Sequence, residues 1–189
     1  SVTRNILIPF DVIKTPFIDE GKRTVSTFVA PIIPYHDTWL LVETSSDTVY
    51  NYIPKENKLI PFLVKKPTNN PFIFLTMGTL TDRYYFFITM KKEFDFIKGR
   101  GFPVTGLMYD KQENAIFEPT VINDDYIKSK SADMTSYPVN NELAAFKTLQ
   151  AYRLVEAYKK DELKGKLKEI AAGLSEGSNP VIMLMKYKE

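Results

Sequence analysis

The sequence has no cysteine and contains only one histidine and one tryptophan in 189 residues. The lack of cysteine excludes disulfide frameworks, thiol nucleophiles, iron–sulfur clusters and every cysteine-based zinc site. Zinc sites without cysteine usually take two or three imidazoles, and a nucleophile–histidine–acid triad has only His36 available. We therefore expect no catalytic set, no metal site and no cofactor.

Strong charge of one sign and long apolar runs are also missing. Lys and Arg total 25 against 23 Asp and Glu, which leaves a net charge of +2. Nucleic-acid binding needs clustered basic residues, so we expect no nucleic-acid partner. No run of about eighteen apolar residues occurs, so the sequence predicts no transmembrane segment. With 44% hydrophobic and 25% charged residues, the composition is typical of a globular protein.

Aromatic and β-branched residues are dense in the first 138 residues, where Pro, Asn, Asp and Gly interrupt them at short intervals. This pattern is typical of a sandwich, barrel or propeller built from short strands. We expect a mainly β fold of antiparallel, four-stranded propeller-type blades. Nine strands are predicted, at Arg4–Phe10, Thr24–Ile33, Thr38–Glu43, Thr48–Ile53, Lys58–Lys65, Phe72–Thr79, Arg83–Phe94, Thr105–Asp110 and Ala115–Ile122.

Two predicted hairpins match each other. In one, the turn 54–57 joins the strands 48–53 and 58–64; in the other, the turn 111–114 joins 107–110 and 115–121. Asn occupies the last turn position in both, and 57 residues separate Asn57 from Asn114. This spacing is near the ~40–50 residues of propeller repeats. The match therefore favours repeated blades.

Each return strand contains a proline, Pro61 in the first hairpin and Pro119 in the second. Because proline cannot donate a hydrogen bond to a neighbouring strand, we expect both return strands to lie at a sheet edge or to carry a bulge.

Helical periodicity starts after Pro138. Asn140 or Asn141 is a suitable cap for a first helix, and Asp161 for a second that ends at Gly173 or Gly177. The apolar positions of the two predicted helices are Leu143, Phe146, Leu149, Leu154, Tyr158, Leu163, Leu167, Ile170, Ala171 and Leu174. A buried strand is predicted at 180–187. We thus expect blades over 1–138, and a helical hairpin with a closing strand over 139–189 that covers a sheet face or edge.

Four segments resemble a known family: 39–50, Thr81–Phe87, Leu163–Ala172 and 179–184. Together they are similar to the C-terminal half of the six-bladed β-propeller family of uncharacterised envelope proteins, usually lipid-anchored, from Gram-negative gut anaerobes. The resemblance extends over most of 22–186. It implies a propeller fold, and a location in the periplasm or at the outer-membrane surface.

The chain departs from that family in length and in its start. Six blades of ~40–50 residues need a chain about twice as long, so this one holds roughly half a ring. Three arrangements stay open: a fragment, two copies that pair to close a ring, or an open sheet assembly. The chain starts at Ser1 without a signal peptide or a lipid-attachment cysteine, and we interpret this start as a cut.

The segment Asp82-Arg83-Tyr84-Tyr85 is the first candidate binding site. An arginine fork beside aromatic rings suits a carboxylate, or a sugar stacked on tyrosine. The same residues are also typical of a turn followed by an aromatic strand, in which case they serve packing. We retain Asp82, Arg83 and Tyr84 as candidate ligand-binding residues.

The longest predicted loop, 91–103, is the second candidate. It mixes basic and aromatic side chains, among them Lys91, Lys92, Phe96 and Arg100. Two acidic residues and the low net charge argue against single-stranded nucleic acid. In a four-stranded blade this loop would join the second and third strands, and loops of this length often carry function. We expect these four residues to contact a ligand or partner.

Three other groups of residues suggest chemistry less strongly than the two candidate sites above. His36 and Asp37 form a potential base and its orienting acid, but neighbours along a strand rarely point the same way, so a surface turn is favoured. Asn123, the two aspartates at 124–125 and Asp133 lack the spacing of a calcium loop. The acidic pair at 19–20 could serve a glycosidase only if the fold brings two carboxylates to a separation of roughly 5–9 Å.

The sequence favours a non-enzymatic binding or scaffold module at the envelope, with a glycan or a protein or peptide as ligand and self-association through open blade edges. The alternative is a propeller-type hydrolase or lyase that uses carboxylate, Tyr and Arg groups. A third hypothesis, a lipocalin-like barrel for an apolar ligand, requires a closed meander.

Overall fold

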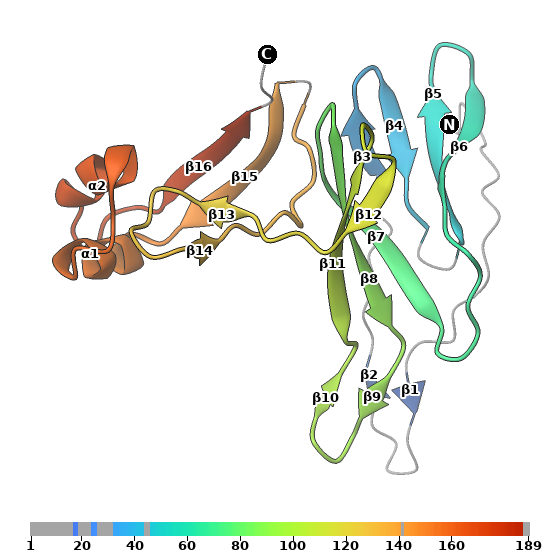
Figure 1. Ribbon diagram of the computed structural model, residues 1–189, viewed down its shortest axis with the longest axis horizontal. Helices are drawn as coiled ribbons and strands as arrows, with labels where there is room; N and C mark the ends of the chain where they lie inside the picture. The colour runs from blue at the N-terminus through green and yellow to red at the C-terminus, as the bar shows by residue number, and fades with distance from the viewer. Residues whose placement is uncertain (1–16, 19–23, 26–31, 44–45, 141, 187–189) are drawn as a thin grey trace, which may run out of the picture. The chain divides into compact units, whose positions relative to one another are not determined.

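The structure is a computed structural model, which describes residues 17–18, 24–25, 32–43, 46–140 and 142–186. The fold is mainly β, as predicted, with antiparallel four-stranded sheets, two helices and a final strand (Figure 1). The chain divides by its contacts into two compact units, 1–77 with 87–107 and 78–86 with 108–189. The sequence favours a different division, into a β part over 1–138 and a part with helices over 139–189. That division stays a prediction.

The first four-stranded sheet is an antiparallel meander. It contains β3 (Ile32–Tyr35), β4 (Thr38–Leu41), β5 (Thr48–Ile53) and β6 (Lys58–Val64) in chain order. Ile33, Leu40 and Val49 are buried at 0–4% exposure, so these strands contribute one apolar face to a core. The predictions of β4, β5 and β6 are accurate to within two residues, whereas β3 overlaps only the last two residues of the predicted strand 24–33.

The second four-stranded sheet has the strand order β12-β11-β8-β7. Its strands are β7 (Ile73–Leu80), β8 (Tyr84–Lys91), β11 (Val104–Asp110) and β12 (Ala115–Phe117). Between β8 and β11 the chain forms a small hairpin of β9 (Phe94–Asp95) and β10 (Arg100–Gly101), which extends beyond the ends of those strands (Figure 1). The predicted single strand 83–94 is therefore two elements, β8 and β9, which are separated at residues 92–93; the chain turns back between Asp95 and Arg100.

Both matching hairpins form, and the same tyrosine–asparagine hydrogen bond occurs at the turn of each. The Tyr52 hydroxyl donates to Oδ1 of Asn57 at 3.0 Å, and the Tyr109 hydroxyl donates to Oδ1 of Asn114 at 2.8 Å. Both Asn residues have positive φ, 50° and 51°, a conformation that Asn tolerates better than most residues. The predicted likeness of the two hairpins is confirmed at the level of single contacts.

The edge position predicted for both return strands is confirmed. β6 is an edge strand, and the register of the β5–β6 pair shifts between Val49 and Tyr50, where Tyr50 pairs with Pro61. β12 is likewise an edge strand and ends at Phe117, two residues before Pro119. The predicted strand 115–122 is thus interrupted, because proline cannot extend the ladder.

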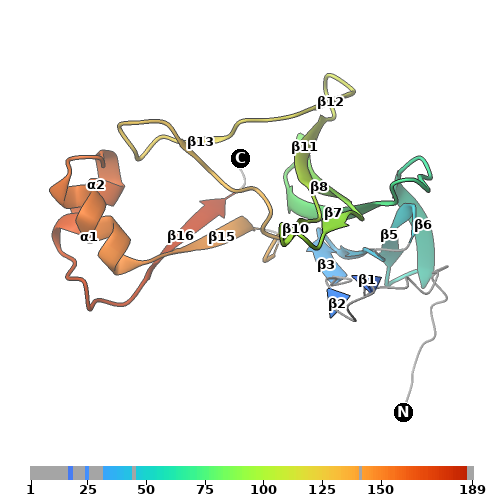
Figure 2. The ribbon, with the colours of Figure 1, turned by 90° about the horizontal axis from the view of Figure 1, so that it is seen from below.

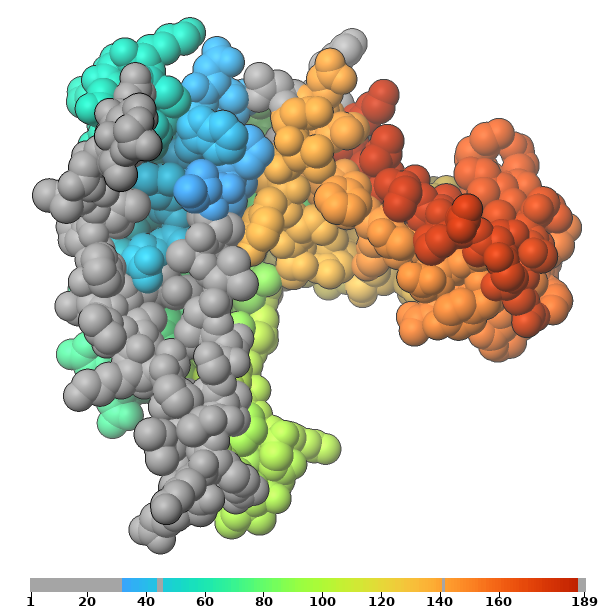
Figure 3. Space-filling view, turned by 180° about the vertical axis from the view of Figure 1, so that it is seen from behind, coloured from blue at the N-terminus to red at the C-terminus, as the bar shows by residue number. Residues whose placement is uncertain are grey.

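The C-terminal segment holds two further pairs of strands and the helices. β13 (Ile122–Asn123) pairs with β14 (Lys130–Ser131), and β15 (Leu143–Leu149) with β16 (Val181–Lys186). Helices α1 (Ala151–Lys159) and α2 (Gly165–Ala172) lie between β15 and β16 in the chain, next to the end of β15 (Figure 2). In the space-filling view the helices are coloured orange and lie beside the red segment that follows them in the chain (Figure 3).

The predicted start of the first helix is wrong. Residues 143–149 form a strand, and the helix begins only at Ala151. The apolar residues Leu143, Phe146 and Leu149 have helical spacing, but β16 supplies hydrogen bonds that keep this segment extended. The strand predicted at 180–187 is confirmed as β16. Its predicted burial is wrong, because Ile182 and Leu184 are 53% and 51% exposed.

The second helix also begins later than predicted. Lys164, not Asp161, is its N-terminal boundary residue, whereas its end at Gly173 is confirmed. Asp161 has a φ of 53° and lies in the turn after α1. Leu163 is fully buried and bridges to Tyr126, which holds this part of the chain extended before α2 starts.

The apolar faces of both helices pack into one cluster, as their amphipathic patterns predict. The cluster joins residues of α1 and α2 to Tyr126 and Leu163, and consists of Tyr126, Leu154, Ala157, Leu163, Leu167 and Ala171. No helix in the described residues is long and apolar enough to cross a membrane.

The remaining strand predictions lie partly outside the described residues. The segment 4–10 lies wholly outside, and 24–33 is described only at β2 (Thr24–Val25) and the start of β3; β2 pairs with β1 (Phe17–Ile18). Within the described part of the chain no sheet closes on itself, so the closed meander of the lipocalin-like hypothesis does not occur there.

Candidate functional site

The first candidate group lies in the tight turn between β7 and β8. The backbone N–H of Thr81 donates to the carbonyl oxygen of Tyr84 at 2.8 Å, and the Thr81 side-chain oxygen accepts from the Tyr84 N–H at 2.8 Å. Thr81 thereby closes the turn that holds Asp82 and Arg83. The predicted turn is correct.

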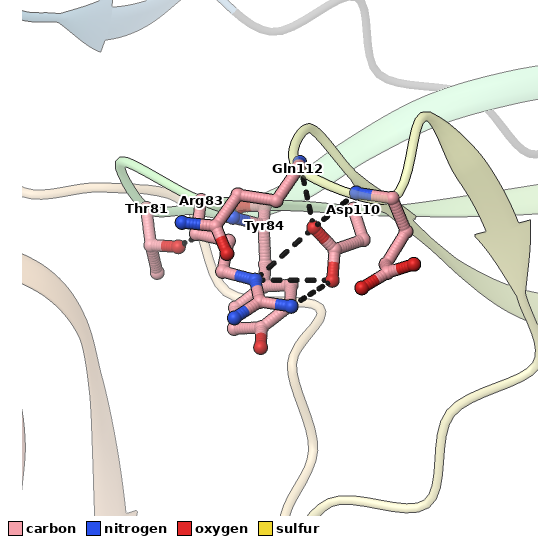
Figure 4. Close-up of polar contacts among 6 residues, drawn as sticks. Thr81, Arg83, Tyr84, Asp110 and Gln112 are labelled. Atoms are coloured by element: carbon pink, nitrogen blue, oxygen red, sulfur yellow. Dashed lines mark hydrogen bonds and ion pairs between the residues drawn. The ribbon is translucent and has the colours of Figure 1, made fainter.

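The Arg83 side chain forms a fork with a carboxylate that the sequence analysis missed, Asp110 at the end of β11 (Figure 4). Nε of Arg83 donates to Oδ1 and Oδ2 of Asp110 at 3.1 and 3.0 Å, and Nη2 donates to Oδ2 at 2.7 Å. The guanidinium also lies 4.9 Å from the centre of the Tyr84 ring. Such a bidentate pair is among the stronger polar contacts in proteins.

Asp110 is buried, with 4% exposure, and its carboxylate is well supplied with donors. Besides Arg83, the backbone N–H groups of Gln112 and Glu113 donate to Oδ1 at 2.8 and 3.3 Å. The hydrogen bond from Arg83 lowers the pKa of Asp110 below its usual value, against the opposing effect of burial, and the two backbone donors lower it further. In return, the carboxylate raises the pKa of Arg83.

This arrangement ties two turns together. The Lys111 N–H donates to the Arg83 carbonyl oxygen at 3.0 Å, so backbone and side chain both connect the β7–β8 turn to the β11–β12 turn. An Asp kept ionised by a permanent cation and two backbone donors is a poor proton donor or acceptor near neutral pH. The Arg83–Asp110 pair therefore serves turn geometry, although the Arg83 side chain is still 40% exposed.

The second candidate group lies in and beside the β9–β10 hairpin. As expected, this segment joins the second and third strands of its sheet. Phe94 packs edge-on against Phe96, with ring centres 4.7 Å apart, and also contacts Phe102 at 5.7 Å. A Cβ at Gly101 would meet the Phe94 ring at 2.1 Å, so the absence of a side chain there lets the two strands close over the ring. The hairpin is thus a packed aromatic unit.

The surface of this hairpin carries basic, acidic and apolar side chains. Lys91 and Arg100 are exposed, and Ile97 at the tip is 97% exposed. An open hollow of about 410 Å³ lies beside the two strands and includes Arg100 and the acidic residues Glu93 and Asp95 in its lining. Lys91 and Lys92 continue from β8, and their backbone N–H groups donate to the carbonyl oxygens of Pro103 and Phe72.

The two candidate groups lie at the two ends of β8. Asp82 and Arg83 precede the strand and Tyr84 begins it, whereas Lys91 ends it and Arg100 follows in β10. The two groups belong to different compact units, so each is considered by itself.

The other residues singled out in the sequence have simple local roles where they are described. His36 and Asp37 are exposed in the β3–β4 turn, as favoured. Asn123 and Asp133 each accept a backbone N–H two residues ahead, which is turn geometry. Among the described residues no three His, Asp or Glu side chains gather as metal ligands. The pair at 19–20 lies outside the described residues.

Comparisons with protein-family models, with curated proteins and with solved structures found no match to this chain. Function must therefore be argued from the residues and their geometry.

Proposed function

We propose that this chain is a non-enzymatic binding or scaffold module of the bacterial cell envelope, at the periplasm or outer-membrane surface, with a glycan or a protein or peptide as its ligand. In this proposal its four-stranded sheets are blades of a six-bladed propeller of the family it resembles. The repeated Tyr–Asn hairpin at a spacing of 57 residues supports blade repetition, because it recurs in the same place in both sheets.

The observation that carries the binding role is the β9–β10 hairpin. Its aromatic rings pack on each other, so the hairpin holds its shape while Arg100, Lys91 and Ile97 remain exposed. The corresponding connection in the first sheet, between β4 and β5, is six residues long, against twelve between β8 and β11. A rigid exposed hairpin with aromatic and basic groups is suited to a ligand with both apolar and hydrogen-bond-accepting surfaces.

The test measures binding of the chain to three probes: polygalacturonate, a neutral mannan and a peptide digest of casein. We expect at least one probe to bind, and the double variant K91A/R100A to weaken that binding by ~10-fold or more, because charged contacts at a rigid site contribute strongly. The control is K55A, which removes an exposed lysine from the β5–β6 turn.

Any one of three results would overturn the proposal. The first is a K91A/R100A variant that binds as well as the K55A control or the unaltered chain. The second is a chain that binds none of the probes. The third is the release of new reducing ends or unsaturated sugars from a polysaccharide, which would favour the hydrolase or lyase alternative.

Self-association is the second part of the proposal. Edge strands carry exposed apolar side chains: Ile32 on β3, Val64 on β6 and Ile116 on β12 are 60–67% exposed. Unpaired edges with such residues favour pairing with another copy. We expect light scattering to give a dimer mass at micromolar concentration, and I116K to shift it toward monomer. A monomeric chain at all concentrations would contradict this part.

A further inference from the structure

A pocket of about 190 Å³ lies where the β13–β14 pair, the β15–β16 pair and the start of α1 meet. Three cations line it, one from each of these elements: Lys130 from β14, Lys147 from β15 and Arg153 from the first turn of α1. No acidic side chain lines it. Because like charges gathered around one hollow repel each other, the arrangement favours a bound anion.

In the described part of the chain, the three cations form no ion pair with a carboxylate. Lysines elsewhere on the helices pair with carboxylates, as Lys160 does with Glu156 and Lys166 with Glu169. Among the described residues, Lys130, Lys147 and Arg153 take part in no ion pair.

The polar contacts that these cations do make leave most of their donors available. Arg153 donates one bond, from Nε to the Tyr152 hydroxyl at 3.0 Å, which leaves its terminal amino groups. Glu156, one turn further along α1, is hydrogen-bonded by Lys160 and also interacts electrostatically with Arg153, although it forms no ion pair with it. The ammonium group of Lys130 lies 4.2 Å from the centre of the Tyr126 ring.

Tyr126 adds a hydroxyl group to the pocket. Within the described part of the chain this hydroxyl has no hydrogen-bond partner. Among the described residues the one fully buried side-chain polar atom without a partner is Asn51 Oδ1, so the Tyr126 hydroxyl is open to solvent and can be reached by a ligand. The Lys130 contact also places a cation next to this ring, so a ligand here would meet a charged donor and a hydroxyl together.

The size of the pocket limits the ligand. Pockets for drug-sized molecules hold ~300–1,000 Å³, so this one suits a small anion or one acidic unit of a longer molecule. Leu149, Leu154 and Met183 give it an apolar floor, whereas Asn123 and Gln150 add hydrogen-bonding groups. The uncapped start of α1 adds its positive end to the same field.

We propose that this pocket binds an oxyanion carried by a compact polar ligand, either a carboxylate on a sugar acid or a phosphate group. Lys147 and Arg153 hold the charge, and Lys130 and Tyr126 complete the contacts. No residue of the β9–β10 hairpin lines this pocket, so the inference does not depend on the function proposed above.

The test titrates the full chain with sodium glucuronate, sodium phosphate and glucose, followed by calorimetry and by NMR of backbone amides. We expect both anions to bind with Kd on the order of 1 mM, and glucose at least ~10-fold more weakly. Amides of 130–132 and 147–153 should shift, whereas those of 48–64 should not. Tighter binding of glucuronate identifies a sugar acid as the source, and tighter binding of phosphate a phosphate ester.

Variants locate the charge contacts. K147Q and R153Q should each weaken anion binding by ~10-fold, as expected for loss of a charged hydrogen bond. K166Q removes the same charge from the outer face of α2 and should leave the affinity unchanged. The melting temperature of each variant checks that it folds.

Three results would each overturn the inference. They are equal binding of glucose and the anions, amide shifts confined to other parts of the chain, and an affinity unchanged in folded K147Q and R153Q. Loss of probe binding by K91A/R100A with intact anion binding would leave this pocket in place, so the two proposals fail separately.

Discussion

Replacing Gly78 with alanine is expected to lower the free energy of unfolding by about 1–3 kcal/mol, the usual cost of forcing extra volume into a packed site. Gly78 lies in β7, where a Cβ would meet the carbonyl oxygen of Met134 at 2.4 Å and the Cα of Thr135 at 3.2 Å. Real Cβ atoms do not approach backbone oxygen that closely, so the 134–136 segment would have to move.

That movement would break two bonds that hold the segment along β7. The Thr79 N–H donates to the Met134 carbonyl oxygen at 3.0 Å, and the Thr79 hydroxyl donates to the Ser136 carbonyl oxygen at 2.9 Å. Thr79 is fully buried, so neither group would regain a partner from water. The loss is therefore larger than steric strain alone predicts.

Gly106 in β11 supplies the matched control. No atom lies within 4 Å of a Cβ built there, and its φ is not positive. G106A should be neutral or stabilise by ~0.5–1 kcal/mol, because alanine loses less backbone entropy than glycine on folding. Urea unfolding followed by circular dichroism measures both variants. Equal stabilities of G78A and G106A would show that the 134–136 segment does not cover β7 as described.

The strands were predictable where the information is local. The turn at Pro54–Asn57 has a proline and an asparagine at positions that favour a reversal, and the residues on both sides are β-branched or aromatic, so the first matching hairpin was predicted almost to the residue. The helix error has the opposite cause. Residues 143–149 have a helical apolar pattern, and only their pairing with β16, more than thirty residues later in the chain, keeps them extended.

The candidate site residues were likewise predictable only where the signal is local in sequence. Arg83 could be singled out because arginine beside tyrosine is visible in sequence, but its partner Asp110 lies 27 residues away. The one available signal was the position of Asp110 directly before a turn, where Asp side chains often accept backbone N–H groups. The anion pocket left no such signal, because Lys130, Lys147 and Arg153 come from three separate elements.

Replacing Asp110 with asparagine should lower the melting temperature at neutral pH by ~5 °C or more, because the change leaves a guanidinium facing an amide in a buried position. If the asparagine oxygen stays in the place of Oδ1 to accept from the Gln112 N–H, an amide NH2 takes the place of Oδ2, which accepts from Nε and Nη2 of Arg83. D133N is the control, since exposed Asp133 accepts one backbone N–H and asparagine can accept it equally well.

The pH dependence of this effect has a definite sign. The Arg83 hydrogen bond lowers the pKa of Asp110 in the folded chain below its usual value near 3.8. The stabilisation is therefore complete above that usual pKa, and it is lost as the pH falls through the lower folded value. The difference in melting temperature between the unaltered chain and D110N should be constant from about pH 7 to about pH 5 and shrink toward about pH 2. A difference that stays constant down to the lowest pH would mean that the Arg83–Asp110 charge pair does not hold the two turns together.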